Sequence, residues 1–216
     1  MKILILSLLT VLLPFFVSAQ DVTLPAPAAA VGVDLTAAIQ NRTVARAFVK
    51  KDLAAKDLST LLSAAIGKRA PDAMASATKA GRTVSFSGDN AYINLYVFDA
   101  KGTYAYDADH HTLKLLTSGD ARAEITPEAM PNGAFIVVYT VNEALTPSFL
   151  KSNPTMFQAM AHETAGASAQ NLALTASALK LSSIVMYNLK PAAVVKAAKL
   201  HKDETPLFLV QVGSAN

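Results

Sequence analysis

Two arginines near the start of the chain have the side-chain type and the spacing to bind a phosphate group. Arg42 and Arg46 lie four residues apart in the stretch Arg42-Thr43-Val44-Ala45-Arg46-Ala47-Phe48. If this stretch is helical, residues four apart share one side, so both guanidinium groups point the same way. Two guanidinium groups held together can clamp a phosphate through bidentate hydrogen bonds. The alternative is an ordinary solvated basic turn, because most charged side chains are simply exposed.

Histidines provide the other candidates for chemistry, and neither of their motifs is complete. His162-Glu163 begins the pattern of a metalloprotease helix, but Gly166 stands where the second histidine is needed. His110 and His111 could bind a metal, yet adjacent side chains in a turn diverge and no further ligands are spaced to join them. We interpret this pair as part of a solvated turn. The sequence therefore predicts no metal site and no catalytic side chain.

Several other reaction classes lack the residues that they need. The chain has no G-x-S-x-G nucleophile elbow, no G-x-G-x-x-G dinucleotide loop and no Walker loop. It contains no cysteine, which excludes thiol catalysis, iron–sulfur clusters and cysteine zinc sites. Lysine and arginine are scattered and do not alternate with aromatic residues, so we expect no nucleic-acid partner.

The first 19 residues have the three-part pattern of a removable signal peptide. Met1-Lys2 supplies a charged start, residues 3–17 are largely apolar, and Val17-Ser18-Ala19 forms a small-residue cleavage site. The apolar run is short for a membrane-spanning helix, and Pro14 interrupts it. We therefore expect an exported protein, periplasmic or secreted, that is soluble and has no membrane span once residues 1–19 are removed.

The remainder of the chain is long enough for one domain with its own core, which we place at residues 34–216. Residues 20–33 contain Pro25, Pro27 and three consecutive alanines without periodicity, which predicts a flexible linker. Without Lys2 the formal charge of +3 falls to about +2, a balance that indicates no particular partner.

Apolar periodicity predicts helices and strands that alternate in the second half of the chain, so we expect layers of helix packed on a sheet. Helices are predicted at Asp57–Gly67, from Asn153-Pro154 to about Leu179, and at Pro191–Leu200. The first has an acidic cap at Asp57 and a glycine, Gly67, where a left-handed cap would lie. Strands are predicted at Tyr92–Phe98, Thr103–Tyr106, Thr112–Leu116, Phe135–Val141, Ile184–Tyr187 and, as a central strand, Leu207–Val212.

A series of motifs, in order from about residue 40 to residue 213, resembles the nitroreductase family of FMN-dependent oxidoreductases. Arg42, Arg46 and Phe48 match the family's R-x-S-x-R-x-F motif. Residues 58–67 resemble its L-S-x-L-L-W-A-A-x-G helix, and residues 81–90 are similar to its R-T-A-P-S-x-x-N segment. Further matches, several of them to the exported branch of the family, are Gly102-Thr103-Tyr104-Ala105-Tyr106-Asp107, His111-Thr112-Leu113, Gly119-Asp120-Ala121-Arg122, Ala165-Gly166, Gln170-Asn171 and Val212-Gly213.

The resemblance implies an α+β fold with three layers, α/β/α, around a central and mostly antiparallel sheet. It implies FMN as the cofactor, which would take hydride from a reduced nicotinamide, NAD(P)H, and pass electrons to a small organic acceptor. The flavin would do the chemistry, and protein groups would tune its electronics without supplying an acid or base. It also implies an intertwined homodimer with flavins at the subunit interface.

On the same resemblance, the cofactor-binding residues are Arg42, Thr43, Arg46, Ser85, Asn90, Met186 and Tyr187. The two arginines would hold the phosphate and ribityl end of FMN. Ser85 and Asn90 would line the ring pocket, and backbone groups of Met186-Tyr187-Asn188 would lie near the reactive edge of the ring.

Four positions depart from the family pattern. The motif serine is Val44, the proline before Ser85 is Val84, a glycine near the flavin edge is Met186, and no basic residue follows Val212-Gly213. Losing one charged hydrogen bond costs about 1.5–3 kcal/mol. These departures leave open an alternative function: a non-catalytic relative that keeps the fold, has lost flavin binding and acts as a binding or structural module.

Overall fold

The structure, a computed structural model, describes residues 20–45, 47–49, 51–69, 81–88, 90–127 and 133–215. Within these residues the chain forms a seven-stranded sheet with the order β1-β4-β3-β2-β5-β7-β6, in which every neighbouring pair is antiparallel. The predicted signal peptide and Arg46 lie outside the described residues. The strands are β1 (Val22–Thr23), β2 (Ile93–Phe98), β3 (Gly102–Asp107), β4 (Thr112–Ser118), β5 (Phe135–Asn142), β6 (Ser182–Met186) and β7 (Glu204–Gly213).

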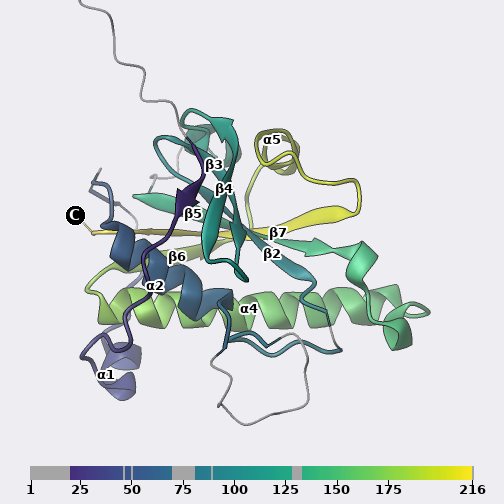
Figure 1. Ribbon diagram of the computed structural model, residues 1–216, viewed down its shortest axis with the longest axis horizontal. Coiled ribbons are helices and arrows are strands. Elements are labelled where there is room, and N and C mark those ends of the chain that lie inside the picture. The colour runs from purple at the N-terminus through teal and green to yellow at the C-terminus, as the bar shows by residue number, and fades with distance from the viewer. Residues whose placement is uncertain are drawn as a thin grey trace, which may run out of the picture.

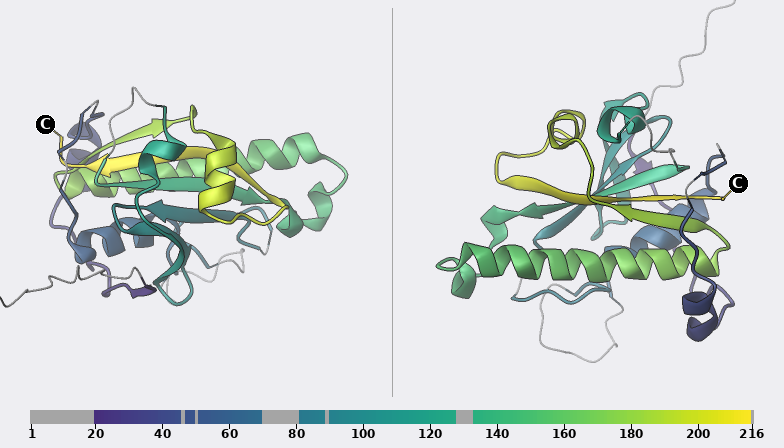
Figure 2. Two further views of the ribbon diagram at one scale, coloured as in Figure 1. Left: turned by 90° about the horizontal axis from the view of Figure 1, so that it is seen from above. Right: turned by 180° about the vertical axis from the view of Figure 1, so that it is seen from behind.

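Helices cover both faces of this sheet. The α-helices are α1 (Leu35–Gln40), α2 (Ala55–Ile66), α3 (Arg122–Ile125), α4 (Pro154–Ala178) and α5 (Pro191–Ala197), and short 3-10 turns are η1 (Glu143–Leu145) and η2 (Ser148–Leu150). The long helix α4 lies under the sheet together with α2, whereas α5 lies over the opposite face (Figures 1 and 2). The predicted three-layer α+β architecture with an antiparallel sheet is therefore confirmed.

Alternate side chains of the central strands enter two separate cores. On β7, Phe208 and Val210 join the cluster that contains α2 and α4 residues, and Leu209 joins the cluster that contains α5 residues. Successive residues of a strand point to opposite faces, so a strand covered on both sides must be apolar at nearly every position. The prediction of a central strand at Leu207–Val212 is confirmed, because β7 lies between β5 and β6.

The predicted capping residues of the helix α2 are wrong. The helix begins at Ala55, so Asp57 lies in its first turn, and Ala54 at the cap position makes no side-chain hydrogen bond. A carboxylate in the first turn still stabilises the helix dipole. Gly67 has a φ of −59°, not a left-handed conformation. The glycine is needed for space, because a Cβ at this position would lie 2.7 Å from Cα of Ser63.

The predicted flexible linker at residues 20–33 packs against the domain in its first half. Val22 pairs with β4 at the edge of the sheet, and Leu24 is buried in the core beside α2. The carbonyl oxygen of Pro25 accepts a hydrogen bond of 2.5 Å from Oγ of Ser59 on α2. The linker prediction is therefore wrong for these residues. Proline and alanine give no periodicity, yet their carbonyls still find donors on a neighbouring helix.

His111 holds this N-terminal segment in place. Its Nε2 lies 2.7 Å from Oγ of Ser59, and its Nδ1 lies 2.8 Å from the hydroxyl of Tyr106. Because Ser59 donates its hydrogen to Pro25, it accepts from Nε2–H, and the neutral ring accepts from Tyr106 at Nδ1. Ser59 is fully buried, so this Ser–His pair is not a hydrolytic site. The predicted solvated turn is wrong for His111, although His110 beside it is exposed.

We expect the packing of residues 22–28 against α2 to weaken in acid, because it depends on His111. Burial lowers the pKa of His111, so the folded protein favours the neutral ring and the unfolded chain binds the proton more tightly. This contribution to stability is present above the unfolded pKa of about 6.5 and is lost as the pH falls below it. The hydrogen exchange of the backbone amides in residues 22–28 should therefore become faster when the pH falls from about 7 to about 5. The measured rates are divided by the intrinsic rates at each pH and compared with the rates of β5.

The matched variant for this test is His111→Asn. His111 has a φ of +54°, a conformation that asparagine tolerates, and the amide does not titrate. The variant should exchange faster at both pH values with no pH response of its own. A wild-type pH response that persists in His111→Asn would assign the effect to another group.

Candidate functional site

The edge strand β6 brings together two of the regions predicted to bind FMN. At its first residue, Oγ1 of Thr43 lies 2.7 Å from Oγ of Ser182. At its other end β6 finishes with Met186, and Tyr187 follows. Tyr187 follows Ser182 by five residues, and extended chain at about 3.3 Å per residue places the two roughly 17 Å apart. An extended FMN molecule has a comparable length from its phosphate to the far edge of its ring.

Arg42 supplies an exposed cation at the first of these ends. Its guanidinium makes no hydrogen bond or ion pair with any residue that the structure describes. The helix α1 ends at Gln40 and residues 42–45 are not helical, so the helical geometry that would align Arg42 with Arg46 is not present in residues 42–45. The position of Arg46 lies outside the described residues. At this end of β6, Arg42 is thus a cation that no described residue neutralises.

The hydroxyl pair beside Arg42 offers a further donor. Two hydroxyl groups that share one hydrogen bond leave one hydrogen free, and Thr43 and Ser182 form such a pair. Val44, which replaces the motif serine, is 54% exposed and offers no hydroxyl group. Ser182 was not singled out from the sequence, since its contact with Thr43 joins residues 139 positions apart.

Met186 stands where the resemblance implies a glycine. Its side chain points toward α5, so it leaves open the face of β6 that is turned toward α4. Its side chain is 5% exposed and packs in the core cluster that contains α5 residues. The side chain of Tyr187 points the other way, and its ring centre lies 6.3 Å from that of His162 on α4 and 5.7 Å from that of Phe208. Tyr187 is 69% exposed. A planar ring placed at this strand end would therefore meet Tyr187 and His162.

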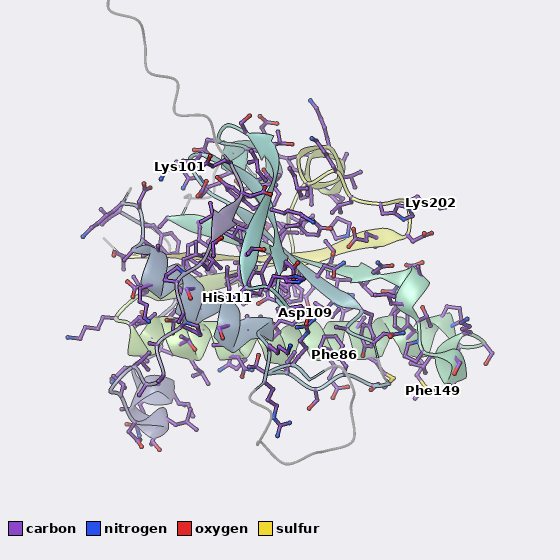
Figure 3. The ribbon with its side chains drawn as sticks, in the orientation of Figure 1. Phe86, Lys101, Asp109, His111, Phe149 and Lys202 are labelled. Carbon is purple, nitrogen blue, oxygen red and sulfur yellow. The ribbon has the colours of Figure 1, made fainter. Side chains whose placement is uncertain are left out.

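Ser85 and Asn90 lie on the segment that precedes β2. Both are exposed, and Asn90 lines a cavity of about 470 Å³ together with Pro147, Phe149 and Lys151. Figure 3 shows Phe149 at the end of α4 that follows η2. The structure therefore places Asn90 beside the first turn of α4.

Arg42 and Asn90 lie at opposite ends of α4. Near the last turn of the helix, Oγ of Ser177 donates to the carbonyl oxygen of Ala38 in α1, two residues before α1 ends. The 25 residues of α4 rise about 1.5 Å each, so the helix is about 37 Å long. This separation is longer than an FMN molecule. One chain therefore brings together Arg42, Thr43, Met186 and Tyr187, but it does not bring Asn90 to the same place.

Large apolar side chains lie exposed on the elements around β6. Leu35 and Ile39 of α1 are 64% and 53% exposed, and Val185 of β6 is 47% exposed. On the exposed side of α4, a Cβ built on Gly166 would find nothing within 4 Å. A glycine inside a helix costs about 1 kcal/mol relative to alanine, and no contact with a described residue requires it. Such surfaces are typical of binding interfaces.

The described residues contain no group of three or more histidine, cysteine, aspartate or glutamate side chains that could hold a metal ion. In the same part of the chain, no helix is both long enough and apolar enough to cross a membrane.

Comparison with known proteins gives one family. The nitroreductase family model matches residues 39–214. A provisionally assigned nitroreductase from Ralstonia eutropha JMP134 is similar in structure with a TM-score of 0.81 and 26% identity, over 93% of this chain and 91% of that one. No curated protein matches the sequence.

Two further solved structures share the fold at lower identity. One is a provisionally assigned nitroreductase from Anabaena variabilis ATCC 29413, with a TM-score of 0.72 and 18% identity over 91% of this chain and 42% of that one. The other is the NADPH:FMN oxidoreductase from Vibrio harveyi complexed with NAD+, with a TM-score of 0.56 and 15% identity over 84% of this chain and 69% of that one.

Proposed function

Because the chain belongs to the nitroreductase family, we propose that it is an exported FMN-dependent oxidoreductase that passes electrons to a small organic acceptor. The observation that carries this proposal is the arrangement along β6. Arg42, whose guanidinium has no partner among the described residues, lies at one end of the strand, and the exposed Tyr187 lies at the other. The distance between these ends suits an extended FMN molecule.

The residues along β6 fit the chemical groups of FMN. Arg42 would bind the phosphate, with a hydroxyl donor from the Thr43–Ser182 pair and, by resemblance, a second cation from Arg46. The backbone after Met186 would meet the ring. When bound, the flavin supplies hydride transfer from a reduced nicotinamide to the acceptor, and the protein supplies binding and orientation.

We infer that each flavin site is shared by two copies of the chain. Asn90 is too far from Arg42 to contact the same flavin within one chain. If two α4 helices pack antiparallel across a two-fold axis, the Asn90 end of one copy lies beside the Arg42 end of the other. The exposed apolar side chains of α1 and β6 support such a contact, and so does the open space at Gly166.

The pattern of residues 1–19 supports export to the periplasm or the medium. We propose NAD(P)H as the electron donor, as the resemblance implies, and a small molecule as the acceptor. The alternative, a non-catalytic relative without flavin, is favoured by Val44, which offers no hydroxyl group to a phosphate.

The visible absorption spectrum of the purified mature protein separates these two functions. We expect the bands of bound flavin, or their appearance after FMN is added and excess removed, with quenching of FMN fluorescence on titration. A colourless protein that fails to take up added FMN would contradict the enzyme proposal and favour the non-catalytic alternative.

A further inference from the structure

The chain has four histidines, and three of them are engaged by polar neighbours. Nδ1 of His110 lies 2.8 Å from Asp107, Nδ1 of His201 lies 3.1 Å from Asp203, and His111 contacts two hydroxyl groups. His162 is different, because it makes no hydrogen bond or ion pair with any residue in the described ranges. Neither of its ring nitrogens therefore helps to stabilise the fold of this part of the chain.

His162 lies where the proposed cofactor would present its reactive edge. It is half-buried on α4, and its ring is tilted by 30° to the ring of Tyr187, the residue that follows β6. Tyr187 is the titratable group that faces it from the sheet, and Phe208 of β7 packs behind Tyr187. Its charged neighbour on α4, Glu163, is exposed. The ring contact with Tyr187 leaves both imidazole nitrogens for a molecule outside the chain.

We propose that His162 donates a proton to the electron acceptor, an inference that rests on the proposed function. The bound flavin would supply hydride, and a quinone that gained this hydride would take up two electrons and one proton and become a hydroquinone anion. An N–H bond of the His162 imidazolium then breaks and an O–H bond forms on the acceptor. The neutral imidazole regains its proton from water. Histidine is the side chain that most often transfers protons to a reacting group.

The pattern His162-Glu163 thus acquires a role other than metal binding. A proton donor positioned at the reacting oxygen contributes typically 10²- to 10⁴-fold in rate. Tyr187 would act as a positioning residue, because its contact with His162 sets the direction of the imidazole. The role needs an acceptor that forms a new O–H bond, which suggests a quinone or a nitro compound as the substrate class.

The test compares two acceptors with the flavin-loaded full chain. A quinone needs a proton, whereas ferricyanide accepts electrons without forming a bond to hydrogen. In stopped-flow experiments, His162→Gln should slow the oxidation of reduced flavin by a quinone by roughly 10²- to 10⁴-fold. Oxidation by ferricyanide and the Kd for FMN from fluorescence titration should remain as in the wild type.

His201→Gln is the matched control, because it removes an exposed imidazole, paired with Asp203, from the segment between α5 and β7. It should change neither reaction. A second variant, His162→Ala, should regain quinone reduction when imidazole is added to the solution.

Two results would overturn the inference and leave the proposed function intact. In the first, a quinone oxidises the reduced flavin of His162→Gln at the wild-type rate. In the second, His162→Gln slows the reaction equally with both acceptors. Wild-type protein that binds no FMN would instead overturn the proposed function, and the role of His162 with it.

Discussion

Replacing Arg42 and Arg46 by alanine should remove bound FMN from the purified protein and leave the fold intact. A hydrogen bond to a charged group contributes about 1.5–3 kcal/mol, so Arg42→Ala alone should raise the Kd for FMN roughly 10- to 150-fold. The double variant should lose more than either single variant, because both cations are proposed to hold one phosphate. Fluorescence titration gives the Kd, and thermal unfolding reports the stability.

Stability should be unaffected by Arg42→Ala because this side chain is exposed and bonds to no described residue. Lys202→Ala is the matched control. It removes the same charge from an exposed residue just before β7 begins (Figure 3), far from the end of β6 where Arg42 lies. A general attraction for anionic FMN would weaken equally in both variants. Unchanged flavin content in Arg42→Ala would refute the phosphate site.

The elements that the sequence predicts best are those whose signals are complete within a few residues. Asn153 caps α4 by accepting a hydrogen bond from the backbone N–H of Met156, and Pro154 occupies the first turn. Both features are visible as an Asn-Pro pair before a long apolar stretch. The strand β7 is likewise visible because a strand covered on both faces is apolar at nearly every position.

The errors occur where tertiary contacts override local signals. Residues 22–28 have no periodicity, and only the positions of Ser59 and His111 explain why they pack against α2. His111 itself occurs in a turn, where an exposed side chain is the usual outcome. Its burial depends on Tyr106 from the neighbouring strand, and no spacing in the sequence indicates that pairing.

The candidate site was predictable residue by residue but not as an arrangement. Motif resemblance identifies Arg42 and Tyr187 separately. Their common position on β6 depends on the contact between Thr43 and Ser182, which are 139 residues apart. The distance of Asn90 from this site is also a property of the folded chain, since it is set by the length of α4. This distance is the reason for expecting a second copy at the site.

Gly166 allows that expectation to be tested. In the single chain, a larger side chain at this position meets open space, so Gly166→Ala should stabilise the helix by up to about 1 kcal/mol. If another α4 approaches closely at this point, Gly166→Leu should instead overpack the contact by about 1–3 kcal/mol. The Kd for dimerisation should then rise roughly 5- to 150-fold, as measured by sedimentation or light scattering over a range of concentrations.

Flavin binding should fall in parallel with dimerisation in Gly166→Leu, because the monomer lacks the partner copy's contribution to the site. Lys196→Leu is the matched control, since it adds the same side chain to the exposed surface of α5 on the opposite face of the sheet. The Lys196→Leu protein should remain dimeric and loaded with FMN. A Gly166→Leu protein that dimerises with unchanged affinity would show that this face of α4 is not the interface. A monomeric variant that keeps its flavin would show that the site lies within one chain, which would leave Asn90 without a role in it.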